Sequence, residues 1–158
     1  MAESKYKQGL YKLRNLKKYK GDPNNVVYRS SWELRAFKWL DDNDHVIEWG
    51  SEELIIPYVS PIDNKQHRYF PDFYVKEQMP NRSIQKYLVE IKPKKQLKPP
   101  KEPQRKTKGY ISEVMEYAKN QSKWQYAKEW CEDRQYGFKR SEEHTSELQS
   151  RGLISYAV

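Results

Sequence analysis

The chain has 158 residues, which is enough for one domain with a core of its own, and it carries a formal net charge of +8 at pH 7. Its single cysteine, Cys131, excludes a disulfide framework, and its three histidines form no pair at the spacing of zinc ligands. No apolar run approaches the length of a membrane span.

Residues 1–22 are predicted to form a basic N-terminal arm, in which lysines and an arginine alternate with tyrosines. Such runs of cations suit the phosphate backbone of a nucleic acid, so Lys17 and Lys18 are candidate contacts for DNA. A solvated segment that is kept open by its own charge is an equally good interpretation. A loop at 22–25 and a short strand at 26–28 follow.

The spacing of apolar residues predicts a helix over residues 31–41, with Trp32 and Leu40 on one face. Glu33 borders this face, where a carboxylate without a partner is costly. Two interpretations of Glu33 stay open. It is a further acid of a metal site, or it closes a capping box by accepting a hydrogen bond from the main-chain amide of Ser30.

Aromatic and β-branched residues predict strands at 47–50, 53–60, 68–76 and 86–92. The segment 77–85 contains a proline and an asparagine and is predicted as a turn, so the last two strands form an antiparallel hairpin. Asp72 is expected on the first strand of this hairpin. Because side chains alternate between the faces of a strand, Glu90 and Lys92 are expected on one face of the second.

Asp72, Glu90 and Lys92 are of the types that a phosphodiesterase site uses. Two neighbouring carboxylates repel each other unless a cation lies between them. Mg²⁺ prefers a few carboxylate oxygens, waters and phosphate oxygens, and can assist phosphate-ester hydrolysis. A lysine adds positive charge where negative charge develops, and can orient or deprotonate the attacking water. The competing interpretation is an ordinary solvated strand edge beside a Pro-Asp turn.

Residues 92–108 are rich in lysine and broken by prolines, so they cannot form one continuous helix and are predicted as an extended basic loop. The loop starts at Lys92, which favours a role in DNA binding over a merely solvated segment. Its candidate DNA contacts are Lys94, Lys95, Lys98 and Arg105.

A helix over 110–131 and a strand from 136 to 139 complete the predicted elements. A helix, three or four strands, a second helix and a last strand indicate an α/β fold with a mixed β-sheet flanked by helices. This domain is expected to span residues 23–139.

Residues 140–158 are expected to be a non-native tail. The run 140–150 matches the translation of a widely used sequencing adapter, and a natural polar linker is the alternative. A foreign tail would leave the last strand truncated after residue 139, and it is expected to pack loosely.

The segments 28–33, 68–75 and 90–93 resemble the restriction-endonuclease-like superfamily of PD-(D/E)xK nucleases. The segments 24–30, 56–61 and 136–139 add a narrower resemblance to the head-completion nucleases of T-even-type tailed phages. The resemblance covers about residues 14–139.

This resemblance implies a restriction-endonuclease-like core and a Mg²⁺-dependent DNA endonuclease, with exonuclease activity as an extension. Asp72, Glu90 and Glu33 would hold Mg²⁺, which Mn²⁺ can replace, and Lys92 would assist the attacking water. The match at Glu33 favours its catalytic interpretation over the cap alone.

The implied substrate is packaged double-stranded DNA, at head completion and head–tail joining. The implied partners are head, portal and tail-joining proteins, in the cytoplasm of the infected bacterium or on the virion. Two alternatives remain: a non-catalytic, basic DNA-binding adaptor at the head portal, and a transposon-end or restriction-type nuclease of the same fold.

Overall fold

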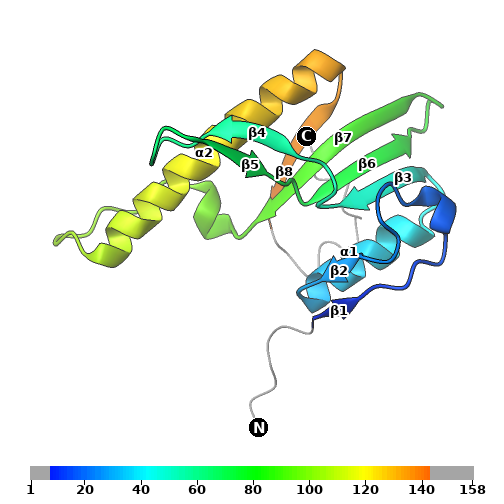
Figure 1. The fold of residues 1–158 in the computed structure, drawn as a ribbon, viewed down its shortest axis with the longest axis horizontal. Coiled ribbons are helices and arrows are strands. Elements are labelled where there is room, and N and C mark those ends of the chain that lie inside the picture. The colour runs from blue at the N-terminus through cyan, green and yellow to red at the C-terminus, as the bar shows by residue number, and fades with distance from the viewer. Residues whose placement is uncertain (1–7, 143–158) are drawn as a thin grey trace, which may run out of the picture.

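A computed structural model describes residues 8–142 and shows a mixed four-stranded sheet between two helices (Figure 1). The strands lie in the order β3-β6-β7-β8, and β8 is parallel to β7 while the other neighbours are antiparallel. Their bounds are β3 (Val46–Ser51), β6 (Phe73–Gln78), β7 (Ile84–Lys92) and β8 (Gly137–Glu142). The predicted α/β class with a mixed sheet and flanking helices is therefore confirmed.

Each face of the sheet has its own hydrophobic core. Helix α1 (Ser31–Asp42) buries its apolar stripe against one face, where Tyr87 and Val89 of β7 point. Helix α2 (Lys108–Arg134) packs on the opposite face with Leu88, and Cys131 is buried there. Because the residues of β7 alternate between the two cores, Glu90 and Lys92 belong to the α2 side of the strand.

Two short antiparallel pairs and two short helical turns complete the fold (Figure 1). The strands β1 (Gly9–Leu10) and β2 (Val27–Tyr28) pair beside α1, and β4 (Ile56–Val59) and β5 (Gln66–Tyr69) form a hairpin beside α2. The helical turns are η1 (Leu16–Lys18) and η2 (Lys94–Leu97), the second of which directly follows β7.

The strand predicted over 68–76 is in fact two strands. β5 ends at Tyr69 and β6 begins at Phe73, so Asp72 lies in the break between them rather than on a strand. Pro71 has no amide hydrogen to give to a ladder, which explains why the pairing is interrupted. The turn predicted over 77–85 is also shorter, because β6 extends to Gln78 and β7 starts at Ile84.

The described part of the N-terminal arm is packed against the domain. Tyr11 and Tyr19 are both 8% exposed and belong to the core on the α1 side. The Tyr11 hydroxyl donates to Asp41 Oδ2 at 2.8 Å, and this carboxylate also accepts from the main-chain amides of Arg14 and Asn15. These two tyrosines are therefore structural residues.

The last strand is longer than expected. β8 continues through Glu142, and its final residues pair in parallel with Glu90, Ile91 and Lys92 of β7. Residues 140–142 are therefore strand-paired rather than loosely packed, whereas the expectations of a native strand truncated after residue 139 and of a non-native tail stay predictions. Strand pairing uses main-chain groups, so many sequences can extend a strand along an open edge. The rest of the predicted tail, 143–158, lies outside the described residues.

Candidate active site

Glu90 and Lys92 lie side by side near the end of β7, as the alternation of side chains predicted. Glu90 is only 4% exposed, and Lys92 Nζ lies 3.5 Å from its Oε1. The hydroxyl of Tyr69, at the end of β5, donates to Glu90 Oε2 at 2.7 Å. Both carboxylate oxygens of Glu90 therefore have a partner, and the side chain is held in one orientation.

Asp72 is held against β7 by its side chain. Its Oδ2 accepts a hydrogen bond from the main-chain amide of Ile91 at 2.8 Å, and its carbonyl accepts from the amide of Glu52 at 3.2 Å. The β5–β6 break therefore places an aspartate carboxylate beside the residue that follows Glu90.

The two carboxyl groups disfavour each other's ionisation. Burial raises the pKa of Asp72 well above its usual range, and the negative charge of Glu90 raises it further. Burial also raises the pKa of Glu90, against the opposing effects of the Tyr69 hydrogen bond and of Lys92. The positive charges of Lys92 and Lys123 offset only part of the effect of burial on Glu90.

A small cavity of about 100 Å³ opens beside Asp72. It lies between the start of α1, the end of β3 and the start of β6. The acids that line it are Glu33, Glu52 and Asp72, and the other lining residues are Ser30, Trp32, Ser51, Phe73 and Ile91. Asp72 and Glu33, which are 39 positions apart in the sequence, therefore face a common space.

Glu33 takes part in the N-terminal cap of α1 and also lines the cavity, and its role as a metal ligand stays a prediction. Ser30 is the N-cap of α1, and its Oγ accepts from the Glu33 amide at 3.1 Å. The Glu33 carboxylate accepts from the main-chain amide of Arg29 at 3.0 Å, not from that of Ser30 as expected. The carboxylate therefore binds the amide one residue before the expected one. This hydrogen bond holds the carboxylate at the wall of the cavity.

Glu52 was missed by the sequence analysis. It follows β3 in the left-handed backbone region, with φ of 53°, and its Oε2 lies 2.8 Å from Arg29 Nη1. This contact raises the pKa of Arg29, with further contributions from Glu33 and Asp72. The only signal in the sequence is an acid directly after a predicted strand, which does not reveal its position opposite Asp72.

The structure does not bring together the full set of predicted metal ligands. Within residues 8–142, no group of three or more histidine, cysteine, aspartate or glutamate side chains is arranged to hold a metal ion. Asp72 lies close to Glu90 on one side and shares a cavity with Glu33 on the other. The acids thus form two overlapping pairs that meet at Asp72.

Comparison with known proteins identifies the family to which this arrangement belongs. Residues 43–143 match the family described as TnsA-like endonuclease N terminal. The chain belongs to this TnsA-like endonuclease family. It is also 38% identical over 135 residues to the head completion nuclease of Enterobacteria phage T4, a match that covers 83% of this chain and 87% of that relative. No solved structure matches.

Membership of this family confirms the restriction-endonuclease-like fold and the resemblance to head-completion nucleases, and it makes the protein a nuclease. The matched region contains Asp72, Glu90 and Lys92, whereas Glu33 precedes it. The roles of these four residues stay predictions.

The predicted DNA contacts of this endonuclease lie in two places. Lys94 and Lys95 belong to η2, immediately after β7, and Lys98 and Arg105 follow in the loop that leads to α2. Lys17 and Lys18 lie in η1, where Lys18 Nζ donates to the carbonyls of Asp41 and Asn43 at the end of α1. Lys18 thus has a structural contact, and its role in DNA binding stays a prediction.

Lys123 is a second residue that sequence analysis missed. This α2 lysine lies over the rings of Tyr58 and Tyr69, with Nζ 5.8 and 5.7 Å from their centroids. Burial lowers its pKa, and the nearby positive charge of Lys92 lowers it further. The sequence offers no signal for this contact, because the position of Lys123 depends on how α2 packs against the β4–β5 hairpin.

None of the helices in the described chain is long and apolar enough to cross a membrane.

Proposed function

We propose that this nuclease is a metal-dependent DNA endonuclease, with exonuclease activity at ends, that acts on packaged DNA at head completion and head–tail joining. The phage role is carried over from the relative named head completion nuclease, most of whose length is matched. Such a role places the protein in the infected bacterial cytoplasm, with head, portal and tail-joining proteins as partners.

The observation that carries the catalytic proposal is the pair of Asp72 and Glu90 next to Lys92. Two carboxyl groups with raised pKa values and an ammonium 3.5 Å from one of them form a costly arrangement that a purely structural role does not require. The arrangement becomes favourable when a cation offsets the negative charge.

The chemistry of this donor set fits Mg²⁺, with Mn²⁺ as a substitute. Mg²⁺ typically takes one or two protein carboxylates and keeps waters and phosphate oxygens as its other ligands. Asp72 and Glu90 would be these carboxylates, and Glu33 would complete the site from the cavity wall. When bound, the ion supplies charge that polarises the scissile phosphate and offsets the charge on the leaving oxygen.

The remaining tasks fall to the chain itself. Tyr69 keeps Glu90 oriented, because its own pKa is raised by burial and by Glu90, so the hydroxyl stays protonated and donates. Lys92 would orient the attacking water or take its proton, and it would offset the charge that develops on the phosphate.

The catalytic proposal is tested by incubating supercoiled plasmid with the protein and Mg²⁺. The parent should nick the plasmid, and Asp72→Asn, Lys92→Ala and addition of a chelator should each abolish nicking. Exposed residues away from the site provide the controls Asp44→Asn and Lys12→Ala, which should cut like the parent. Retention of DNA without any cutting, equal in all variants, would instead support the DNA-binding adaptor.

The phage role needs a separate test. A phage T4 strain without its own head completion nuclease is grown on bacteria that express this protein. Plaques should form with the parent protein and not with Asp72→Asn. A parent that nicks plasmid but restores no plaques would support a nuclease with another biological role, such as the transposon-end or restriction-type alternative.

A further inference from the structure

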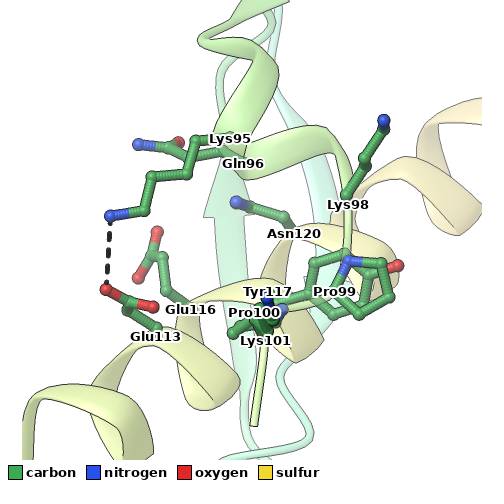
Figure 2. Close-up of a pocket in the computed structure, with 10 residues that line it drawn as sticks. All are labelled: Lys95, Gln96, Lys98, Pro99, Pro100, Lys101, Glu113, Glu116, Tyr117 and Asn120. Atoms are coloured by element: carbon green, nitrogen blue, oxygen red, sulfur yellow. Dashed lines mark ion pairs between the residues drawn. The ribbon is translucent and has the colours of Figure 1, made fainter. Parts of the chain in front are cut away.

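A second and larger cavity, of about 450 Å³, lies between α2 and the segment that follows β7 (Figure 2). One wall is the α2 face with Glu113, Glu116, Tyr117 and Asn120. The other wall is formed by Lys95, Gln96, Lys98, Pro99, Pro100 and Lys101. Its volume lies within the range of about 300–1,000 Å³ that is typical of sites for small ligands.

The side chain of Asn120 is the unusual feature of this cavity. It is 1% exposed, and neither its Nδ2 nor its Oδ1 has a hydrogen-bond partner in the described part of the chain. Figure 2 shows it reaching into the space between the two walls. Buried polar atoms are nearly always paired in native proteins, because an unpaired group keeps its full desolvation cost. A ligand that supplies both a donor and an acceptor would remove this cost.

The wall opposite α2 can adjust to admit such a ligand. After η2 ends at Leu97, no helix or strand forms until α2 begins at Lys108. The segment is held to α2 by an ion pair of 3.5 Å between Lys95 and Glu113, both of which are exposed. Exposed pairs of this kind contribute little stability. Leu97 packs against the core on the α2 side, so the part of the wall that can shift at low cost is the segment beyond it.

The chemistry of the lining matches a single nucleotide. A carboxamide offers a donor and an acceptor side by side, as needed to bind adenine through its amino group and a ring nitrogen. Tyr117 and the two prolines provide flat, apolar surfaces for a base, and Lys98 and Lys101 provide positive charge for its phosphate. The carboxylates of Glu113 and Glu116 are each paired, with Lys95 and Lys119 respectively.

The cavity adjoins the proposed active site. Asn120 precedes Lys123 by three residues, so the two side chains share a face of α2 and are separated by a rise of about 4.5 Å. Lys123 in turn interacts electrostatically with Lys92 and Glu90. A nucleotide at Asn120 would therefore lie close to a phosphate at Lys92.

We propose that this cavity binds one unpaired nucleotide of the DNA substrate, with the base paired to the Asn120 carboxamide. The endonuclease would then prefer DNA whose bases are already unpaired, such as single-stranded overhangs at an end. The inference rests on the proposed DNA endonuclease function, because it places the nucleotide next to that site.

The test compares two fluorescent duplexes, one blunt and one with a short 3′ overhang of adenines. Binding is followed by fluorescence anisotropy in chelator, so that no cleavage occurs. The parent should bind the overhang about tenfold more tightly than the blunt duplex, as expected for one bidentate amide–base contact. Asn120→Leu should lose this preference while its affinity for blunt DNA is unchanged. Gln125→Leu, which changes an exposed amide on the same helix, should keep the preference.

Thermal unfolding separates a ligand-binding amide from a structural one. Asn120→Leu removes an unpaired buried group, so it should melt at the same temperature as the parent or higher. Tyr117→Ala is the second variant, and it should also lose the overhang preference. A large fall in melting temperature for Asn120→Leu, or full preference in folded Tyr117→Ala, would overturn the proposal.

Failure of this inference can be told apart from failure of the proposed function. A parent that nicks plasmid in Mg²⁺ but binds both duplexes equally would keep the endonuclease and overturn the nucleotide site, which would favour a protein segment as the occupant. A parent that prefers the overhang but never cuts would keep the nucleotide site and overturn the catalytic proposal.

Discussion

The two oxygens of Glu90 are held by groups of different chemistry. Tyr69 gives a neutral hydrogen bond at 2.7 Å, and Lys92 gives a charge at 3.5 Å. Both partners favour the ionised carboxylate, whereas burial opposes it. The protonation state of Glu90 is therefore set by a balance that one substitution can change.

Tyr69→Phe should shift this balance without removing a charged residue. Loss of the hydrogen bond that lowers the pKa of Glu90 should raise that pKa further above its usual value. Because the proposed mechanism needs ionised Glu90, the acid limb of the pH–rate profile should move to higher pH. An unchanged acid limb, with only a lower maximal rate, would mean that Tyr69 does not act through Glu90. Tyr58→Phe, on the neighbouring strand of the β4–β5 hairpin, is the matched control.

Asp72 should destabilise the folded protein when no divalent cation is present. Its folded-state pKa is raised, so between the usual and the raised value the folded protein binds a proton that the unfolded chain has released. Over that interval stability falls as the pH rises. Asp72→Asn keeps an acceptor for the Ile91 amide but removes the charge, and it should stabilise the protein at about pH 8 by on the order of 1 kcal/mol.

Thermal unfolding in chelator at two pH values measures this effect. The gain from Asp72→Asn should shrink at about pH 4, where the carboxyl in the parent is itself protonated. Addition of Mg²⁺ should raise the melting temperature of the parent and have little effect on the variant. A variant that is less stable than the parent at both pH values would contradict the repulsion between Asp72 and Glu90.

At the scale of the element, the N-terminus of α1 has two tasks. Ser30 caps the helix, and the carboxylate of Glu33 binds the amide of Arg29 while it lines the cavity beside Asp72. The partial positive charge at the start of a helix stabilises an acid at this position. The same turn thus begins the helix and presents a carboxylate to the proposed site.

A pair of substitutions separates these tasks. Glu33→Gln keeps an acceptor for the Arg29 amide, so the melting temperature should change little while nicking of plasmid is lost. Ser30→Ala should cost about 1 kcal/mol of stability, as for other N-cap serines, and keep activity when assayed below its melting temperature. Full activity in Glu33→Gln would restrict Glu33 to the cap.

The local parts of the site could be predicted from the sequence. Glu90 and Lys92 share a face because the alternation of side chains along a strand is a local property. The predicted hairpin then brings the preceding strand, and with it the region of Asp72, alongside them. Asp72 was expected on a strand. Pro71 lacks an amide hydrogen, which weakens strand pairing at that position but does not by itself predict that the strand breaks there. Glu52 could not be predicted, since its place depends on the register between β3 and β6. The cavity around Asn120 could not be predicted either, because it forms only where the loop after β7 packs onto α2.

At the scale of the whole molecule, the positive charge has both structural and candidate binding uses. Lys18 completes the end of α1, and Lys123 is partly buried beside the β4–β5 hairpin. Many of the remaining cations lie in the segment after β7, which starts at the proposed site. The net charge alone therefore overstates the surface that is available to a phosphate backbone.

The salt dependence of DNA binding tests which cations are used. Lys94 and Arg105 lie outside the nucleotide cavity, so the double variant Lys94→Ala/Arg105→Ala should weaken binding to all DNA alike. The slope of log affinity against log salt should become shallower by about 0.9 for each phosphate contact that is lost. The double variant Lys12→Ala/Lys128→Ala removes the same charge from other elements and should keep the parental slope.

The position of β7 inside the sheet has one more consequence. β6 and β8 flank β7 as far as Val89; beyond it, Glu90 and Lys92 pair with β8 alone, and the Ile91 amide between them binds the Asp72 carboxylate. Such a segment exchanges its amide hydrogens only when a large part of the domain opens, whereas a loop without ladder partners exchanges them readily. We therefore expect the proposed reacting groups and the wall of the neighbouring cavity to move on different timescales, so that DNA would meet a fixed set of charges while the loop after η2 adjusts to it.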